Sequence, residues 1–258
     1  MRSTRNVFQF GAMALVLATS GCAGSGASAP GGSSALGAFA AAKSDGKTNV
    51  TGTYSGTLQD SVAGLEAGSF QLVQYVNSLS GTGVVVTAGG IVNVDVNGTV
   101  DGKTITGTVT DETNGCVSDV TLEIAGKKLS GKYQATGSCT GSGTVSIELV
   151  PSNFSASGKY SGSLVDESLG QTASIKLDLT QTGSSLSATF TDKTTFGKGS
   201  GTASGSISNA VATLSVSPVG DPCAPYAMTA IAYSKGIYGY YSSTVSGCNN
   251  VGYLTAKE

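Results

Sequence analysis

Few side chains in this sequence could do chemistry, and most of them are carboxylates. The chain contains no histidine, which excludes Ser-His-Asp and Cys-His catalysis and every zinc site that uses His. Asp111 with Glu112, and Asp166 with Glu167, stand where strands are expected to end, and a pair of carboxylates is what a glycosidase needs. Acidic residues at loop starts are also ordinary solvated turn residues. We therefore expect no catalytic residues and no enzyme activity.

Cofactor and metal sites are equally sparse in the sequence. Asp95, Asn97 and Asp101, in DVNGTVDG, resemble the start of an oxygen-rich calcium loop, but the spacing of an EF-hand and its bidentate Glu are missing. We expect the string to consist of outward polar residues beside hairpin turns. No phosphate-binding loop and no glycine motif between a strand and a helix is present. The sequence predicts neither a cofactor nor a metal.

The elements that would position any site come as two copies of one unit. The stretch GTYSGTL, at 52–58, returns as GKYSGSL at 158–164, and in both copies apolar and small residues alternate with polar ones, as in a half-buried strand. We expect an all-β fold of two tandem eight-stranded antiparallel up-and-down barrels, or closely related sandwiches. The expected strands are 51–60, 69–76, 79–86, 90–100, 103–110, 117–124, 128–136 and 141–150, then 157–166, 172–181, 185–191, 199–207, 210–217, 226–232, 236–243 and 250–256.

Loop lengths give each unit two different ends. Connections from even to odd strands are tight, as at Asp101-Gly102, a preferred hairpin dipeptide. Connections from odd to even strands are mostly longer, including 61–68 and 111–116. In a meander these longer loops emerge together, so each unit is expected to have a tight end and a mouth of long loops.

The cysteines test this arrangement. Cys116 and Cys139 fall in mouth loops of the first unit, and Cys223 and Cys248 fall in the corresponding loops of the second. The two cysteines of each repeat are close in sequence and are expected at the same mouth, where they can reach each other. We therefore predict the disulfides Cys116 to Cys139 and Cys223 to Cys248. Such bonds require an oxidising compartment.

The N-terminal region has the features of a targeting signal. Arg2 and Arg5 precede an apolar run at 7–18, which is too short for a membrane span and typical of a signal peptide. Residues 22–49 are rich in Gly, Ala and Ser and read as a flexible tether. The expected domains are therefore the signal peptide at 1–21, the tether at 22–49, a first barrel at 50–150, a linker at 151–156 and a second barrel at 157–258.

Two tyrosines break the internal symmetry. Outward Ser130 and Lys132 of the first repeat correspond to Tyr238 and Tyr240 of the second. We expect these tyrosines to cover an interface with the other repeat or to be ordinary surface residues, and the alternative is a candidate surface for a protein or glycan partner. A net charge of −2 without a basic run argues against nucleic acid.

Two resemblances follow from these motifs. Ser20-Gly21-Cys22 resembles a bacterial lipobox, although Thr19 stands where Leu is commoner, and this implies lipidation of Cys22. With this motif, the tether, the GxYxGxL strands and the late cysteines, the chain resembles uncharacterised bacterial Gly/Ser/Thr-rich lipoproteins. The absence of Asp after Cys22 implies an outer-membrane lipoprotein, attached to the membrane through its N-terminal lipid, with domains in the periplasm or at the cell surface.

A looser similarity runs to avidin-like and lipocalin-like barrels, although Tyr54 and Tyr160 stand where avidins have Trp. We expect a lipid-anchored, non-catalytic binding or structural module of the cell envelope. The alternative is a carrier of a small apolar ligand inside a barrel. The inward set of the first unit includes Gly56, Leu58, Leu129 and Tyr133, and its many glycines suit either a strongly bent, filled barrel or a cavity. We expect the filled form.

Overall fold

The computed structural model describes residues 48–194 and 197–258, and every regular element in this part of the chain is a β-strand. Accordingly, those residues include no helix long and apolar enough to cross a membrane. The sixteen strands are β1 (Gly52–Asp60), β2 (Gly64–Tyr75), β3 (Ser78–Thr87), β4 (Gly90–Asp101), β5 (Thr104–Asp111), β6 (Val117–Ala125), β7 (Lys128–Ala135), β8 (Ser142–Leu149), β9 (Gly158–Asp166), β10 (Gln171–Thr182), β11 (Ser185–Thr194), β12 (Gly197–Ser208), β13 (Val211–Pro218), β14 (Tyr226–Tyr233), β15 (Gly236–Ser243) and β16 (Val251–Lys257). The signal peptide, nearly all of the predicted tether and the lipidation site Cys22 lie outside the described residues.

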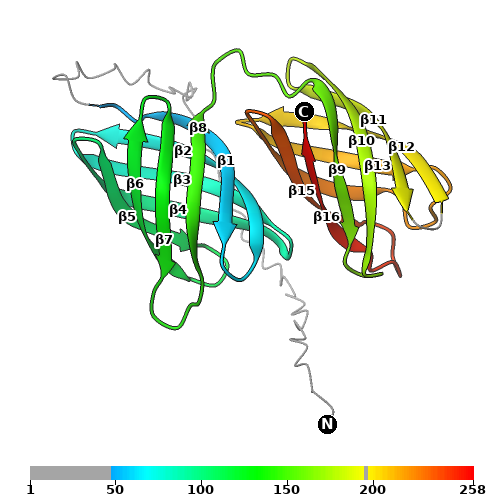
Figure 1. The fold of residues 1–258 in the computed structure, drawn as a ribbon, viewed down its shortest axis with the longest axis horizontal. Coiled ribbons are helices and arrows are strands. Elements are labelled where there is room, and N and C mark those ends of the chain that lie inside the picture. Colours follow the sequence, from blue (N-terminus) through cyan, green and yellow to red (C-terminus); the bar gives the residue numbers. More distant parts are fainter. Residues whose placement is uncertain (1–47, 195–196) are drawn as a thin grey trace, which may run out of the picture. The chain divides into compact units, whose positions relative to one another are not determined.

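The strands form two closed antiparallel barrels, β1–β8 and β9–β16, in which each strand pairs with its neighbours in sequence (Figure 1). The first barrel closes between β1 and β8, with Tyr54 opposite Leu149. The second closes between β9 and β16, with Leu164 opposite Leu254. The predicted up-and-down barrels are therefore confirmed, and the sandwich alternative does not apply.

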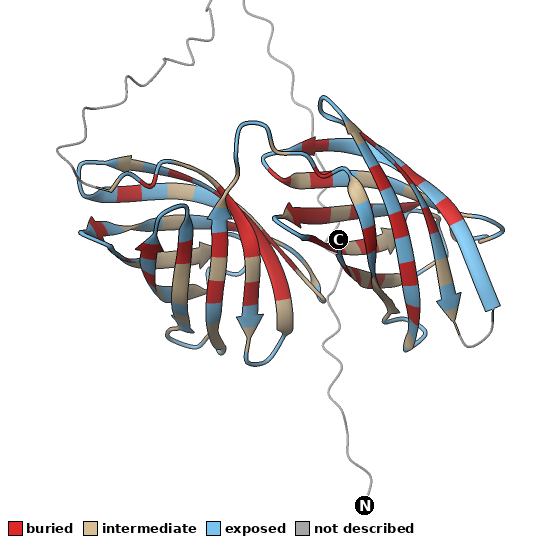
Figure 2. Cartoon of the chain, turned by 45° about the horizontal axis from the view of Figure 1, so that its top comes forward, coloured by how far each residue is buried: buried red, intermediate tan, exposed pale blue. Residues whose placement is uncertain are grey.

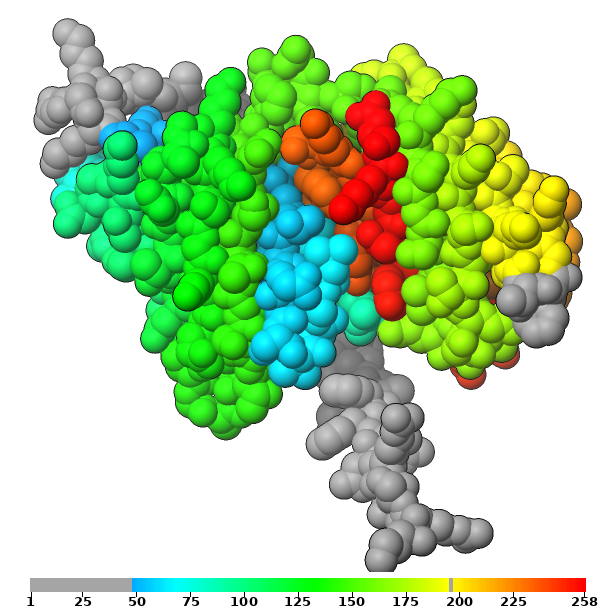
Figure 3. Space-filling view, viewed as in Figure 1, coloured from blue at the N-terminus to red at the C-terminus, as the bar shows by residue number. Residues whose placement is uncertain are grey.

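Burial alternates along the strands because successive side chains point to opposite faces (Figure 2). In β10, Ile175, Leu177 and Leu179 are buried inside the barrel, whereas the intervening Lys176 and Asp178 are exposed. On the face seen in Figure 3, side chains close the spaces between neighbouring strands. The inward apolar residues of each barrel form its own core cluster.

Inward glycines allow the walls to bend. A Cβ at Gly56 would overlap the carbonyl oxygen of Ser146 on β8, and a Cβ at Gly131 would overlap that of Thr121 on β6. Only glycine permits so close an approach of neighbouring backbones, which is how a sheet curves tightly into a small barrel.

The predicted mouth of long loops is present, but the bounds of one loop differ from the prediction. We expected the first mouth loop to run from 61 to 68, but β2 already begins at Gly64. The inward alternation continues backwards from Phe70 through Gly68 to Glu66, which faces Leu58 across the β1–β2 pair. Glu66 therefore belongs to the barrel wall and not to a solvated loop.

The two barrels belong to one compact unit and share a small apolar cluster. Ala67 and Val86 of the first barrel and Ile231 and Tyr238 of the second are at most 1% exposed. Across the same contact, the hydroxyl of Ser69 donates a hydrogen bond to the carbonyl oxygen of Asn209 at 2.5 Å. The small outward side chains of the first barrel thus leave room for Ile231 and Tyr238 of the second barrel to pack against them.

This cluster corrects the reading of the two tyrosines as an exposed partner or glycan surface. Tyr238 is 1% exposed, and its ring stacks on Tyr253 at a centroid distance of 5.9 Å. Tyr240 is partly buried and packs against the same cluster. The interface alternative is the one that the structure supports, because a partner needs rings that solvent can reach.

Candidate ligand-binding cavities

Each barrel contains a cavity that is open to solvent. The cavity in the first barrel measures about 330 Å³ and that in the second about 230 Å³. The first lies in the range of small-ligand pockets, which begins near 300 Å³. Our expectation of a filled interior is therefore wrong for the first barrel. Inward glycines add no volume to the lumen, so the apolar side chains around them leave space.

The wall of the first cavity is mostly aliphatic. Strand residues deep in the barrel supply it, among them Phe70, Leu72, Leu79, Ile105, Leu122 and Ile147. The lining also includes Thr87, Asp111, Asn114, Cys139 and Thr140, at the ends of the strands and in the mouth loops. The cavity therefore runs from an apolar interior to the loop end of the barrel.

Glu66 is the unusual member of this lining. Its side chain is 8% exposed and projects from β2 into the barrel, two positions after the strand begins. No described residue forms a hydrogen bond or an ion pair with its carboxylate. Buried carboxylates are normally paired, because burial without a partner disfavours the charged form.

A bonded pair, Asp60 and Tyr133, lies at the same end of the lumen. The hydroxyl of Tyr133 donates to Oδ2 of Asp60 at 2.5 Å. Oδ1 of Asp60 accepts hydrogen bonds from the backbone N–H groups of Val62 at 2.6 Å and Ala63 at 2.8 Å. Asp60 thus holds the β1–β2 turn and the tyrosine in place.

The surroundings of Asp60 and Glu66 shift the pKa values of their carboxyl groups in opposite directions. Burial alone would raise the pKa of Asp60, but the hydrogen bonds from Tyr133, Ala63 and Val62 outweigh it and lower that pKa. Burial, with a smaller effect of the Asp60 charge, raises the pKa of Glu66 to about 7. Burial, followed by the bond to Asp60, raises the pKa of Tyr133. Near neutral pH, Asp60 is an anion and Glu66 can change charge.

The second cavity is more strictly apolar inside. Ala173 occupies the register position of Glu66, because it faces Leu164 as Glu66 faces Leu58. Its acidic residues, which are Asp166, Asp192 and Asp221, stand at the mouth ends of the strands or in a mouth loop. The second barrel therefore has no counterpart of the buried carboxyl.

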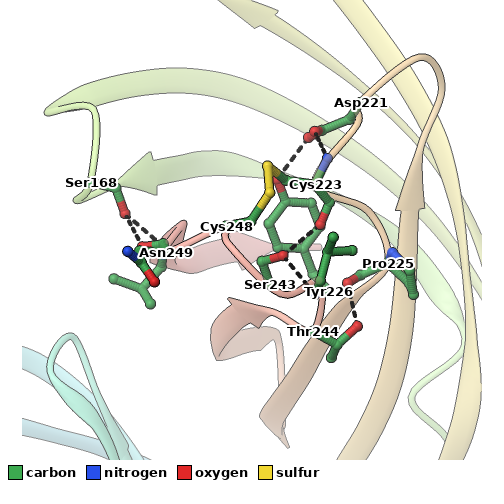
Figure 4. The surroundings of a disulfide bond; sticks show 11 residues. Ser168, Asp221, Cys223, Pro225, Tyr226, Ser243, Thr244, Cys248 and Asn249 are labelled. Carbon is green, nitrogen blue, oxygen red and sulfur yellow. Dashed lines mark hydrogen bonds between the residues drawn. A yellow bond between two sulfur atoms is a disulfide. The ribbon is translucent and has the colours of Figure 1, made fainter.

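The rim of the second barrel is tied together around its disulfide (Figure 4). The Tyr226 hydroxyl donates to Oδ2 of Asp221 at 2.7 Å, and the N–H of Cys223 donates to Oδ1 at 2.8 Å. The Ser243 hydroxyl donates to the carbonyl oxygen of Cys223 at 2.6 Å. Asp221 is therefore engaged in holding its own loop.

Both predicted disulfides are present. Cys116 is bonded to Cys139 and Cys223 to Cys248, with Cα atoms 5.8 Å and 5.7 Å apart. Each bond joins two loops of one mouth. Pairing within repeats is confirmed.

The other acidic residues singled out in the sequence do not form a shared site. Asp111 lines the first cavity and Asp166 the second, whereas Glu112 and Glu167 line neither. Asp95 and Asp101 are exposed along β4. In the described part of the chain, no group of three acidic, Cys or His side chains could hold a metal ion.

The sequence pattern alone does not identify Glu66, because it predicts a loop over 61–68. The signal was available: Gly64, Glu66, Gly68 and Phe70 continue the period of two that marks the inward face. A charged residue within that alternation contradicts a simple apolar interior, and this contradiction indicated a special position.

Comparison of the chain with protein-family models, with curated proteins and with solved structures finds no match.

Proposed function

We propose that this protein is a non-catalytic carrier of small ligands in the cell envelope, with the ligand inside the first barrel. The observation that carries the proposal is the cavity of about 330 Å³, with aliphatic walls and a mouth of loops. Ligand sites are concave and mainly apolar, with a few polar groups that fix orientation. Eight strands form the size of barrel that can hold one small ligand.

The roles of the mouth carboxylates support binding over catalysis. Asp60 accepts hydrogen bonds from the backbone of its own turn, and Asp111 accepts one from the N–H of Thr113 at 2.7 Å. Asp166 similarly accepts from the N–H of Leu169 at 2.9 Å. These residues shape the mouths through turn contacts that need no reacting substrate.

The proposed location is the outer membrane, through a lipid on Cys22. The lipobox-like Ser20-Gly21-Cys22 and the resemblance to Gly/Ser/Thr-rich lipoproteins support it. Two disulfides favour an oxidising compartment such as the periplasm or the cell surface. The looser similarity to lipocalin-like barrels agrees with a carrier.

A contact quencher can test the lumen directly, because the chain contains no Trp. In the mature full chain, Val92→Trp places a single reporter on the cavity wall of β4. Bromooctanol quenches Trp fluorescence on contact, so we expect saturable quenching as it fills the cavity.

The neighbouring variant Ile91→Trp is the control, since Ile91 is 44% exposed. It should show only the linear quenching that random collisions cause. Equal, non-saturable quenching of both reporters would refute the carrier and favour the competing role, a structural module of the envelope.

A further inference from the structure

We propose that the first barrel selects ligands that combine a protonated amine with a short apolar body, and that Glu66 receives the amine. The inference deepens the proposed function and rests on it, because it assigns the ligand class of the same cavity. It follows from one carboxyl that the fold buries without a partner inside an apolar lumen.

The first step is the position of Glu66. It is more than nine-tenths buried, faces Leu58 across the β1–β2 ladder and lines the cavity. Folding buries most of this side chain in the barrel, facing the cavity, without supplying a donor from the described residues. A ligand that donates from a cationic group would provide both the missing hydrogen bond and the opposite charge.

The second step is the charge of the surroundings. Asp60 and Asp111 also line the first cavity, whereas no Lys or Arg is found among its described lining residues. Every charged group that the cavity presents is therefore acidic. An anionic ligand such as a fatty acid would be repelled, and a neutral one would leave Glu66 without an ion-pair partner.

The third step is the distribution of polarity along the lumen. Glu66 stands two positions below the mouth end of β2, and Phe70 and Leu72 follow it inward on the same strand. A ligand with one charged end would place that end near the mouth and its apolar body deeper. A cavity of about 330 Å³ limits this body to a short chain or a small ring system.

The second barrel provides an internal comparison. Ala173 stands where Glu66 stands, while the inward Leu164 corresponds to Leu58. Its three aspartates, at the mouth, leave the deep wall uncharged. The buried carboxyl that would pair with an amine is therefore found in the first barrel and not at the same position of the second, and Ala173→Glu should introduce it there.

Three ligands of equal chain length test the inference: octylamine, octanol and octanoate. In the Val92→Trp full chain, each competes with bromooctanol for the first cavity. We expect octylamine to displace bromooctanol at a concentration at least tenfold lower than octanol, and octanoate to be the weakest. Glu66→Gln should abolish the preference while leaving octanol competition within about twofold, because the amide keeps the shape of the side chain.

The gain-of-function variant supplies the matched control. With a reporter at Val216→Trp, on the wall of the second cavity, octylamine should compete only slightly better than octanol in the parent, because the three aspartates of that cavity stand at its mouth. Ala173→Glu should increase the preference for octylamine by about the factor that Glu66→Gln removes in the first barrel. Circular dichroism of each variant confirms that the barrels are folded.

The outcomes distinguish the two proposals. If octanol competes but octylamine is no better, or if the preference survives in Glu66→Gln, the amine assignment is wrong and the carrier stands. If none of the three compounds displaces bromooctanol and its quenching does not saturate, both proposals fail.

Discussion

The side-chain oxygen Oε1 of Gln74 accepts a hydrogen bond from the backbone N–H of Val50 at 3.0 Å. The second barrel repeats this bond between Gln181 and the N–H of Ala156 at 2.8 Å. Val50 and Ala156 are each 1% exposed and precede the first strand of their barrel. One glutamine in each repeat therefore secures the entering chain at the tight-turn end, opposite the mouth.

Replacing this glutamine should loosen the tight-turn end. Gln74→Leu removes the bond to Val50 and the bond that Nε2 donates to the carbonyl oxygen of Val76 at 2.8 Å. An unpaired N–H costs about 1–3 kcal/mol, so the free energy of unfolding in urea should fall by about 1–2 kcal/mol. Gln71→Leu, at an exposed position of the same strand, should have a much smaller effect. Equal losses would contradict the assignment.

The pKa of Glu66 predicts a dependence of stability on pH. Its pKa is raised from 4.5 to about 7, so the folded state holds a proton that the unfolded state releases. Stability from this group is therefore greatest below pH 4.5, falls as the pH rises towards 7 and is constant above it. At about 1.4 kcal/mol per pKa unit, reduced because solvent in the open cavity screens the charge, Glu66→Gln should stabilise the protein by about 1–2 kcal/mol above pH 7 and by little at pH 4.5.

Urea titrations at several pH values measure this difference. The titratable groups that interact with Glu66 are Asp60 and Tyr133 of the first barrel and Tyr238 of the second, and Asp111 lines the same cavity. Asp60→Asn is the control for the charge that contributes to the Glu66 pKa. A stability gain in Glu66→Gln that does not change with pH would show that Glu66 does not titrate in this range.

The hydroxyl of Tyr238 offers a test of the contact between the barrels. It is buried without a hydrogen-bond partner, and burial raises the pKa of this tyrosine. Tyr238→Phe removes an unpaired polar group and should increase the free energy of unfolding by about 1 kcal/mol. Tyr226→Phe, which loses a bond to Asp221, should decrease it by about the same amount. A loss of stability in Tyr238→Phe would mean that the hydroxyl has a partner, such as a bound water.

The disulfides should stabilise the mouths. Cys116 and Cys139 are separated by 23 residues and Cys223 and Cys248 by 25. On the chain-entropy model, a loop of this size corresponds to about 3 kcal/mol. Replacing both cysteines of one pair with Ala should lower the urea midpoint accordingly. Unchanged stability would show that the barrel alone fixes the loops.

Lipidation is expected to depend on one cysteine. Labelling of cells with a fatty-acid analogue should mark the protein, and Cys22→Ala should abolish the label and release the protein from the membrane fraction. Cys116→Ala with Cys139→Ala is the matched control and should retain the label. Labelling that persists in Cys22→Ala would refute the lipobox assignment.

The sequence by itself determined the repeated architecture. The period of two from Gly52 to Leu58, repeated from Gly158 to Leu164, is a local property of a half-buried strand. Tight and long connections then specify a meander, and the meander brings Cys116 near Cys139. These predictions succeeded because neighbouring strands in a meander are also neighbours in sequence.

Only the tertiary structure decided which faces are buried and what the interiors contain. Tyr238 is outward-facing by its alternation, and it is buried because the other barrel covers it. The cavity depends on how side chains from eight strands fill a closed lumen, a sum that no single segment contains. The raised pKa of Glu66 has the same origin, since closure of the barrel buries most of its side chain without supplying a hydrogen-bond donor.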